Sequence, residues 1–183
     1  MRSVGASHRS SAGSRDAQRA QYGGRLMSAL IERLDDLPVD HLTPLIAESE
    51  QEGLSFVRRL TEEWATAQNR FDRPAEVLFA ARVDGRLVGV CGLNVDPYAG
   101  DPGVGRVRHL YVLPAYRRQG VGRQLVGAVV AAAHGSFITL RLSTNDPAAA
   151  RLYEALEFRR YSGDARCTHA LRRPTCPHVV QPC

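Results

Sequence analysis

The chain has 183 residues and a formal net charge of +5 at pH 7, which is enough sequence for one domain with a substantial core. Residues 1–25 hold five arginines and one acid and so carry +4 of that charge. The remainder is nearly neutral, so we expect no nucleic-acid partner. No run approaches the roughly 18 apolar residues of a membrane span, so we expect no membrane partner either.

The two ends of the chain differ in composition from the middle. Residues 1–26 are rich in Ser, Gly and Arg, with no Leu, Ile or Phe before Leu26. This composition buries too little apolar surface to offset its ordering entropy, so a disordered extension is predicted. A basic arm or a non-native leader remains an alternative. One domain is expected over residues 27–173, followed by an irregular tail at 174–183.

The cysteines predict neither disulfides nor a metal. The first stretch lacks the apolar core of a secretory signal, and no two cysteines form a Cys-x-x-Cys pair. We therefore expect free thiols and a cytoplasmic protein. Cys176, His178 and Cys183 near His169 match no standard zinc spacing, so no metal is predicted.

Hydrophobic periodicity and turn residues predict alternating strands and helices. Asp84-Gly85 is a strong hairpin-turn signal, and Asp146-Pro147 predicts an N-cap followed by proline at the first helical position. Prolines and glycines predict a loop over residues 94–106. The predicted order is a strand at 26–34, helices at 39–50 and 54–69, strands at 76–83, 86–94 and 107–113, a helix at 121–134, a strand at 137–142, a helix at 147–156, and strands at 158–161 and 165–171.

The second predicted helix is amphipathic. Its apolar stripe consists of Leu54, Val57, Leu60 and Trp64. Helical spacing then places Arg58, Glu62 and Glu63 on the outer face.

The turn at residues 117–123 is predicted to bind a phosphate group. It joins a strand to a helix and reads Arg-Arg-Gln-Gly-Val-Gly-Arg. A helix N-terminus offers unpaired N–H groups and a partial positive charge. Glycines let the backbone approach a ligand, and Arg117, Arg118 and Arg123 add charge. The chain contains no lysine, which excludes a Walker A loop, and Leu125 replaces the third glycine of a dinucleotide fingerprint.

Arg117, Gly120 and Gly122 fit the pattern [Q/R]-x-x-G-x-[G/A]. With the preceding Leu-Tyr-Val-Leu-Pro segment, this region resembles the acetyl-CoA-binding segment of the GNAT superfamily of N-acetyltransferases. The resemblance implies a single-domain α/β fold with a mixed, mostly antiparallel sheet, splayed central strands and flanking helices. It implies cofactor contacts from Leu110, Tyr111, Val112, Arg117, Arg118, Gln119, Gly120, Val121, Gly122 and Arg123.

Residues 145–158 are similar to the second motif of the family, Asn-x-x-Ala-x-x-Leu-Tyr-x-x-x-Gly-Phe. Asn145 stands one residue further from Tyr153 than the motif has it, and Glu157 replaces the glycine. The resemblance implies that Asn145 binds the cofactor. The shifted spacing leaves this contact open, because Asp146 occupies the usual place.

The implied reaction is attack of an amine on the acetyl thioester, without a covalent enzyme intermediate. The amine must lose a proton and the oxyanion needs donors, for which a backbone N–H near Val112 is expected. Tyr153 matches the tyrosine that serves many members as general acid. The central strand offers no carboxylate, so His109 is the candidate base, with a water chain to a loop carboxylate as the alternative. Both residues also have an alternative role in packing.

The acceptor contacts are predicted at Asp96 and Tyr98, in the loop before the central strand; a solvated turn is the alternative there. The predicted function is acetyl transfer from acetyl-CoA to a primary amine of a small molecule or peptide. A non-catalytic CoA-binding module is the alternative. The sequence leaves open the acceptor, the acyl length, and whether the protein is a monomer or a homodimer.

Overall fold

The computed structural model describes residues 28–173. The predicted extension at 1–26 and the tail at 174–183, with Cys176, His178 and Cys183, lie outside the described residues. Within that part of the chain the elements are β1 (Leu30–Arg33), α2 (Val39–Gln51), α3 (Phe56–Ala65), β2 (Val77–Val83), β3 (Arg86–Val95), β4 (Val104–Val112), the 3₁₀ turn η1 (Pro114–Tyr116), α4 (Val121–Ala132), β5 (Thr139–Leu142), α5 (Pro147–Glu154), β6 (Arg159–Arg160) and β7 (His169–Arg172). This is the predicted order of helices and strands.

The strands form one sheet in the order β1-β2-β3-β4-β5-β7-β6. The pair β4–β5 is parallel, and the other neighbours are antiparallel. The predicted mixed, mostly antiparallel sheet is thereby confirmed. The parallel pair is short, because Val104, Gly105 and Arg106 pair with β5 and the rest of β4 does not.

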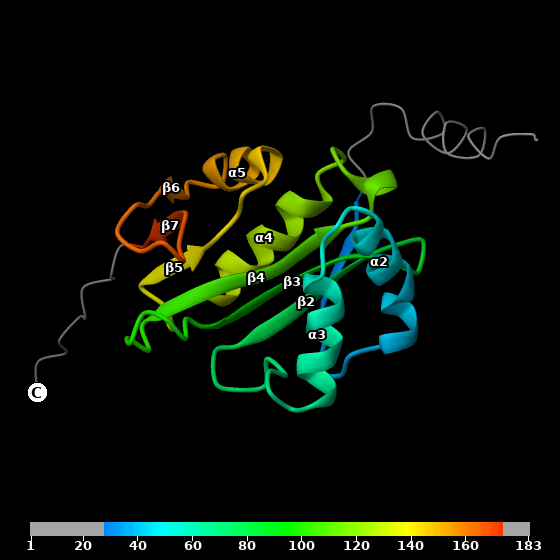
Figure 1. Cartoon of the computed structure of the whole chain (residues 1–183), viewed down its shortest axis with the longest axis horizontal. Coiled ribbons are helices and arrows are strands. Elements are labelled where there is room, and N and C mark those ends of the chain that lie inside the picture. The colour runs from blue at the N-terminus through cyan, green and yellow to red at the C-terminus, as the bar shows by residue number, and fades with distance from the viewer. Residues whose placement is uncertain (1–27, 174–183) are drawn as a thin grey trace, which may run out of the picture.

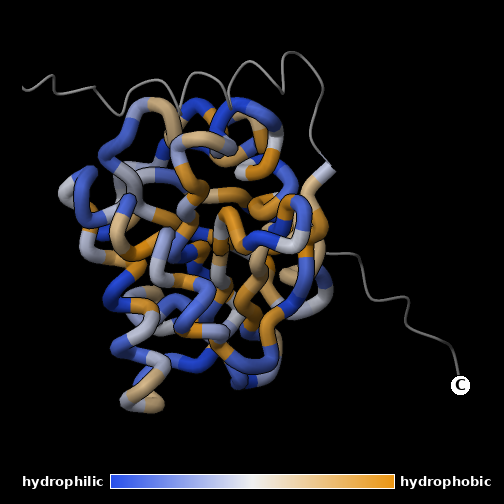
Figure 2. Tube along the Cα trace, turned by 90° about the vertical axis from the view of Figure 1, so that its right-hand side faces the viewer, coloured by the Kyte–Doolittle hydropathy of each residue, from blue (hydrophilic) through white to orange (hydrophobic). Residues whose placement is uncertain are grey.

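Helices cover both faces of the sheet (Figure 1). Helices α2 and α3 lie on the face toward the viewer and α4 lies behind it, beside α5. Leu152 of α5 comes close to Gly122 at the start of α4. Hydrophobic segments lie between the layers, and hydrophilic ones form the outside (Figure 2). Fully buried side chains such as Leu42, Leu60 and Leu125 come from the helices on both faces.

The hairpin turn between β2 and β3 is as predicted. Asp84 and Gly85 have φ of 49° and 77°. Positive φ at both central residues matches the right-handed twist of the strands, which is why Asp-Gly is favoured there.

The predicted bounds of the loop at residues 94–106 are wrong at both ends. Strand β3 continues to Val95 and β4 begins at Val104, so the loop comprises only residues 96–103. The residues at the start of β4 are extended because Gly105 lies between two strands, opposite Val95 of β3 and Leu140 of β5. Ladder hydrogen bonds on both sides outweigh the weak strand propensity of glycine.

Several other helices and strands are shorter than predicted. Helix α3 ends at Ala65 rather than 69, because Ala67 takes φ 57° and the N–H groups of Gln68 and Asn69 return to the Glu63 carbonyl. Leu54 precedes the helix and is 37% exposed. The last two strands contract to Arg159–Arg160 and His169–Arg172 around a turn in which Asp164 accepts from the Arg166 N–H.

Two further features of the described residues concern the cysteines and the length of the helices. Cys91 and Cys167 are free and buried. Across residues 28–173, no helix is long and apolar enough to cross a bilayer.

Two glycines provide a test of the packing. A Cβ on Gly105 would lie 2.8 Å from Leu140 Cδ2 and 2.9 Å from Phe137 Cγ, whereas a Cβ on Gly127 of α4 meets nothing within 4 Å. We expect Gly105→Ala to destabilise the fold by about 1–3 kcal/mol through overpacking. Gly127→Ala should stabilise it by about 0.5–1 kcal/mol through helix propensity. Urea unfolding midpoints measure both, and equal midpoints for the two variants would contradict the packing described for Gly105.

Candidate active site

The turn before α4 presents a row of free backbone donors. Gly120 precedes the helix with φ 87°, and Arg118 also takes a positive φ of 64°. No side chain caps the helix. Within residues 28–173, the backbone N–H groups from Arg118 to Arg123 have no hydrogen-bond partner. Unpaired N–H groups at a helix N-terminus suit a phosphate.

The side chains of the turn divide into two groups. Those of Arg118 and Arg123 are exposed, so their charges are free to face a ligand. Val121 is buried and Gly122 faces Leu152 and Val112, so these two residues can offer only backbone groups. Gln119 donates to the Ala115 carbonyl at 2.8 Å, and its Oε1 is buried without a partner in the described chain.

Arg117 does not contribute a free charge to the turn. Its guanidinium donates to both carboxylate oxygens of Glu52, each at 2.7 Å, and its Nε donates to the Val112 carbonyl. The Tyr111 hydroxyl also donates to Glu52, at 3.1 Å. The Arg117 hydrogen bonds lower the pKa of Glu52. Arg117 therefore links the turn to the C-terminal end of α2. A direct contact between Arg117 and the cofactor remains a prediction.

A bulge interrupts β4 directly before the predicted cofactor-binding strand segment. Val90 pairs with Tyr111 and Gly92 with Arg108, so His109 and Leu110 together face Cys91. His109 has φ 55°. Such a bulge bends and twists its strand. The bulge lies past Arg106, the last residue of β4 that pairs with β5, so β4 and β5 are unpaired beside Leu110, Tyr111 and Val112.

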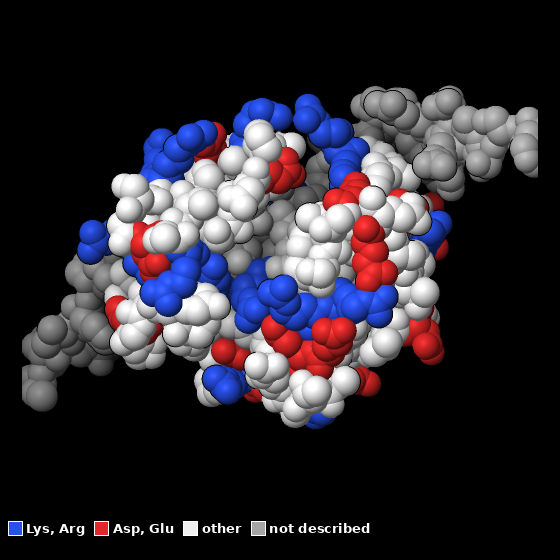
Figure 3. Space-filling view, in the orientation of Figure 1, with Lys and Arg blue, Asp and Glu red and all other residues white. Residues whose placement is uncertain are grey.

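The separation of the strands coincides with a hollow on the surface. Figure 3 shows this hollow between the half that carries α2 and α3 and the half that carries α5 and β5–β7. Blue surface, which is arginine because the chain has no lysine, lies along one side of it.

His109 is buried beneath α3. Its side chain is 3% exposed and its ring lies near the rings of Phe56 and Phe71. Nδ1 is 3.0 Å from the Phe56 carbonyl, and Nε2 has no hydrogen-bond partner within the described chain. Burial, reinforced by Arg108, lowers the pKa of His109 to about 4. The imidazole is therefore neutral at pH 7.

Tyr153 of α5 is also buried. Its ring packs edge-on against Phe158, with centroids 5.5 Å apart. Burial, with a contribution from Cys91, raises its pKa well above 10. Across residues 28–173 the hydroxyl makes no hydrogen bond. The group stays protonated over the working pH range, as a proton donor must.

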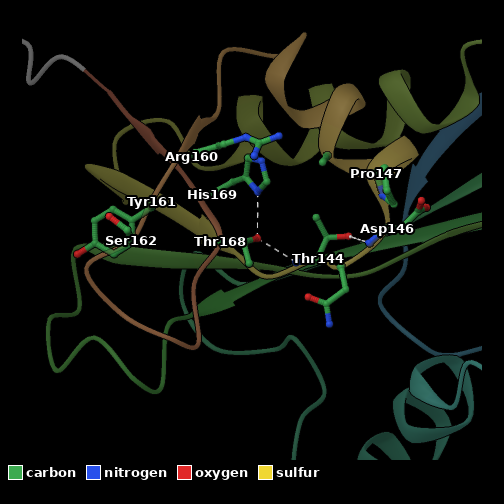
Figure 4. Close-up of a pocket in the computed structure, with 10 residues that line it drawn as sticks. Thr144, Asp146, Pro147, Arg160, Tyr161, Ser162, Thr168 and His169 are labelled. Atoms are coloured by element: carbon green, nitrogen blue, oxygen red, sulfur yellow. Dashed lines mark hydrogen bonds between the residues drawn. The ribbon is translucent and has the colours of Figure 1, made fainter.

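Asn145 is among the residues that line a pocket of about 480 Å³ at the end of β5, and Figure 4 shows this pocket. Asp146 caps α5 as predicted, accepting from the Ala148 N–H at 2.8 Å. On the other side, the Thr168 hydroxyl contacts His169 Nδ1 at 2.9 Å and accepts from the Thr144 N–H at 3.0 Å. Asn145 is exposed, so its amide is free to meet a ligand.

The two predicted acceptor residues lie in different environments. Asp96 is buried, accepts from the Tyr98 N–H at 2.9 Å and lies 3.6 Å from Arg106. These contacts order the loop. Tyr98 is 48% exposed, and the guanidinium groups of Arg106 and Arg166 lie 5.0 and 4.8 Å from its ring centroid. Acceptor binding by either residue remains a prediction.

Sequence reasoning missed Glu63, which was placed on the outer face of its helix. The side chain is 13% exposed and turns toward the sheet, with Oε1 3.4 Å from Arg108 Nη2 and Oε2 3.9 Å from His109 Nε2. The sequence does indicate this inward orientation, because Glu63 follows Leu60 by three residues and Phe56 by seven. These intervals place it on the buried stripe.

Comparison with known proteins agrees with this geometry. Residues 43–158 match the model of the acetyltransferase (GNAT) family. The chain belongs to this family. A solved structure from Exiguobacterium sp. 255-15, assigned as an acetyltransferase, shares 30% identity with a TM-score of 0.72, covering 80% of this chain and 94% of that one.

Two curated relatives match parts of this GNAT chain. Mycothiol acetyltransferase from Salinispora arenicola is 38% identical over 109 residues, which are 60% of this chain and 33% of the relative. Aminoglycoside N(6')-acetyltransferase type 1 from Klebsiella aerogenes is 48% identical over 59 residues, 31% of this chain and 39% of the relative. The chain therefore spans less than half the length of either relative.

A more distant neighbour shares the fold and has a ligand. A GNAT family N-acetyltransferase from Escherichia coli, solved in complex with CoA, has a TM-score of 0.58 at 20% identity, covering 80% of this chain and 82% of that one. Among residues 28–173 no group of three His, Cys, Asp or Glu side chains is arranged to hold a metal ion.

The Glu52–Arg117 pair gives a pH-dependent prediction. Because the folded-state pKa of Glu52 is lowered, its stabilisation is present above the unfolded-state pKa and is lost as pH falls through the folded-state value. Both side chains are about a third exposed, so the bidentate pair contributes only about 0.5–1 kcal/mol. Glu52→Gln should lower the unfolding free energy by this amount at pH 7, and the difference should shrink toward pH 4. A difference that stays constant with pH in denaturant titrations would contradict this assignment.

Proposed function

We propose that the protein is an acetyl-CoA-dependent N-acetyltransferase that acts on a primary amine of a small molecule. The observation that carries the proposal is the row of unpaired N–H groups from Arg118 to Arg123, at the start of α4 and beside the separated strands. Both curated relatives are named after small molecules, mycothiol and an aminoglycoside. These names favour a small molecule over a peptide as acceptor.

The residues present fit the donor. The free N–H groups of residues 118–123, with the exposed Arg118 and Arg123, would hold the pyrophosphate of acetyl-CoA. The pantetheine arm would lie along Leu110, Tyr111 and Val112, where β4 still pairs with β3 but no longer with β5. Asn145 would contact the arm from the end of β5. The bound donor supplies an activated acetyl thioester.

The remaining roles belong to the protein. A backbone N–H near Val112 would stabilise the oxyanion. Tyr153 would protonate the departing thiolate, because burial keeps its hydroxyl in the acid form. His109 Nε2, whose lone pair is unused, would accept a hydrogen bond from the incoming amine. Tyr98 and Asp96 would order the loop beside the acceptor.

Ligand-dependent thermal unfolding tests the phosphate-binding turn. Acetyl-CoA at a hundredfold excess over its dissociation constant adds about 2.7 kcal/mol, which for a domain of this size raises Tm by about 5–10 °C. Arg118→Glu and Arg123→Glu should abolish most of the rise, because each introduces a negative charge beside the pyrophosphate. Arg172→Glu, exposed beside the start of β5, should retain it. No rise in the wild type would reject the proposal.

Thiol release tests turnover. Purified protein with acetyl-CoA and a panel of kanamycin, glucosamine, spermidine and a short peptide should release CoA with at least one small-molecule amine. Cofactor binding without release on any amine would instead support a non-catalytic CoA-binding protein.

Tyr153→Phe separates chemistry from stability. We expect kcat to fall by about 10²–10³-fold, as for loss of a general acid, with little change in the apparent affinity for acetyl-CoA. The unfolding free energy should change little, because the hydroxyl removed makes no hydrogen bond within residues 28–173. An undiminished kcat would exclude Tyr153 as the acid.

A further inference from the structure

A small polar cluster lies where α3 packs on β4 (Figure 1). It contains Glu63 from α3, Asn69 after that helix, Asn94 from β3, and Arg108 and His109 from β4. These residues come from three separate segments of the sequence, residues 63–69, 94 and 108–109. Their hydrogen bonds show which groups of the cluster have partners and which have none.

The His109 ring presents a lone pair to Glu63. A backbone carbonyl only accepts hydrogen bonds, so the 3.0 Å contact between Nδ1 and the Phe56 carbonyl assigns the proton to Nδ1. Nε2 then carries a lone pair. It is buried without a hydrogen-bond partner in the described chain and lies 3.9 Å from Glu63 Oε2. Two acceptors thus face one another with no donor between them.

The Glu63 carboxylate has only long contacts. Arg108 Nη2 is 3.4 Å from Oε1 and Asn69 Nδ2 is 3.2 Å from Oε2, whereas charge-assisted bonds usually measure about 2.7–2.9 Å. Lone pairs therefore remain for a further donor. Glu63 and Nε2 thus present two neighbouring acceptors, 3.9 Å apart, to a donor that could approach both.

The neighbouring amides fix this arrangement. Asn69 Oδ1 accepts from Asn94 Nδ2 at 2.8 Å and from the Phe71 N–H at 3.4 Å. With its oxygen so engaged, the Asn69 amide directs its NH₂ group to Glu63 and to Asn94 Oδ1. The orientation of the carboxylate is thus set by groups that cannot themselves supply that donor.

An ammonium group matches these two acceptors. It carries three N–H donors and a positive charge, so it can bond both Nε2 and a carboxylate. The cluster adjoins the bulge, directly before Leu110, Tyr111 and Val112, where the proposed function places the thioester. An amine held there would lie on the α3 side of that strand segment.

We propose that Glu63 is the group that removes the proton from the acceptor amine, and that Nε2 of His109 holds the same ammonium in place. This inference rests on the proposed acetyltransferase function. It assigns the base to α3 and supplies the carboxylate that β4 lacks.

The ammonium transfers one proton to Glu63, and the free amine lone pair forms a C–N bond with the acetyl carbonyl carbon. The C–S bond then breaks. The departing thiolate takes a proton from Tyr153, the second amine proton replaces it through solvent, and Glu63 passes its proton to water. The products are the N-acetyl amine, CoA thiol and one released proton.

The charged groups acting on His109 are Glu63 and Arg59 from α3 and Arg108 from its own strand. Burial and Arg108 lower the pKa of His109 to about 4, although Glu63 opposes them. The imidazole therefore stays a neutral acceptor, and the proton ends on the carboxylate.

The first test uses binding alone. In protein labelled with ¹⁵N-histidine, Nε2 of His109 should show the shift of an unprotonated nitrogen, and methylammonium chloride should move that resonance whereas sodium chloride should not. The response should vanish in Glu63→Gln and persist in Glu62→Gln, the exposed neighbour on the same helix. No shift in the wild type, or an equal shift in Glu63→Gln, overturns the inference.

The second test uses turnover with the panel amine that releases CoA fastest. Glu63→Gln should lower kcat by about 10²–10⁴-fold at pH 7, and its rate should then rise with pH up to the pKa of the amine itself. Glu62→Gln should keep the wild-type rate and pH profile, and Glu63→Asp should recover part of the loss. An unchanged acetyl-CoA thermal shift in Glu63→Gln shows that the fold and the donor site are intact.

The two proposals fail in different ways. If the wild type neither binds acetyl-CoA nor releases thiol, the acetyltransferase function is rejected, and the inference that rests on it falls with it whatever the nitrogen resonance shows. If the wild type turns over and Glu63→Gln keeps its rate and pH profile, the function stands and Glu63 is not the base.

Discussion

The site depends on the conformation of His109. A histidine at φ 55° in the middle of a strand costs on the order of 1–2 kcal/mol. The Phe56 carbonyl and the rings of Phe56 and Phe71 hold the side chain in place, and Gly92 leaves room for Phe71, since a Cβ there would lie 2.4 Å from its ring. The resulting bulge lies just beyond the point where β4 loses its pairing with β5. The hollow of Figure 3 lies between the two halves that these strands join.

Polar groups without hydrogen-bond partners among the described residues lie at both ends of this site. At the start of α4 the unpaired groups are donors, the N–H groups of residues 118–123. Under α3 they are acceptors, His109 Nε2 and the weakly bonded Glu63 carboxylate. Unpaired N–H groups at a helix N-terminus suit an anion, and a buried acceptor without a partner suits a donor. Donors fit a phosphate, and acceptors fit an ammonium.

Local signals in the sequence predicted most of the architecture. Asp84-Gly85, Asp146-Pro147 and the turn at Gly120 are specified by residues adjacent in the chain, and all three lie where expected. The bulge was not predictable, because it depends on the register between β3 and β4, in which His109 and Leu110 together lie opposite Cys91. Residue periodicity could have revealed the inward turn of Glu63, but its partners Asn69, Asn94 and Arg108 come together only in the fold. Arg117 likewise has the expected position, while its engagement by Glu52, sixty-five residues away, is a tertiary contact.

Glu52 connects three elements of the fold. It lies at the C-terminal end of α2 and bonds both Tyr111 of β4 and Arg117 of the turn before α4. A shift of α2 would therefore move the segment that would hold the donor. A shift of that segment would likewise move the end of α2. Coupling between two binding sites is reciprocal in free energy. Displacement of Glu52 would consequently alter the affinity for acetyl-CoA, and acetyl-CoA bound at the turn would in return stabilise the C-terminal end of α2.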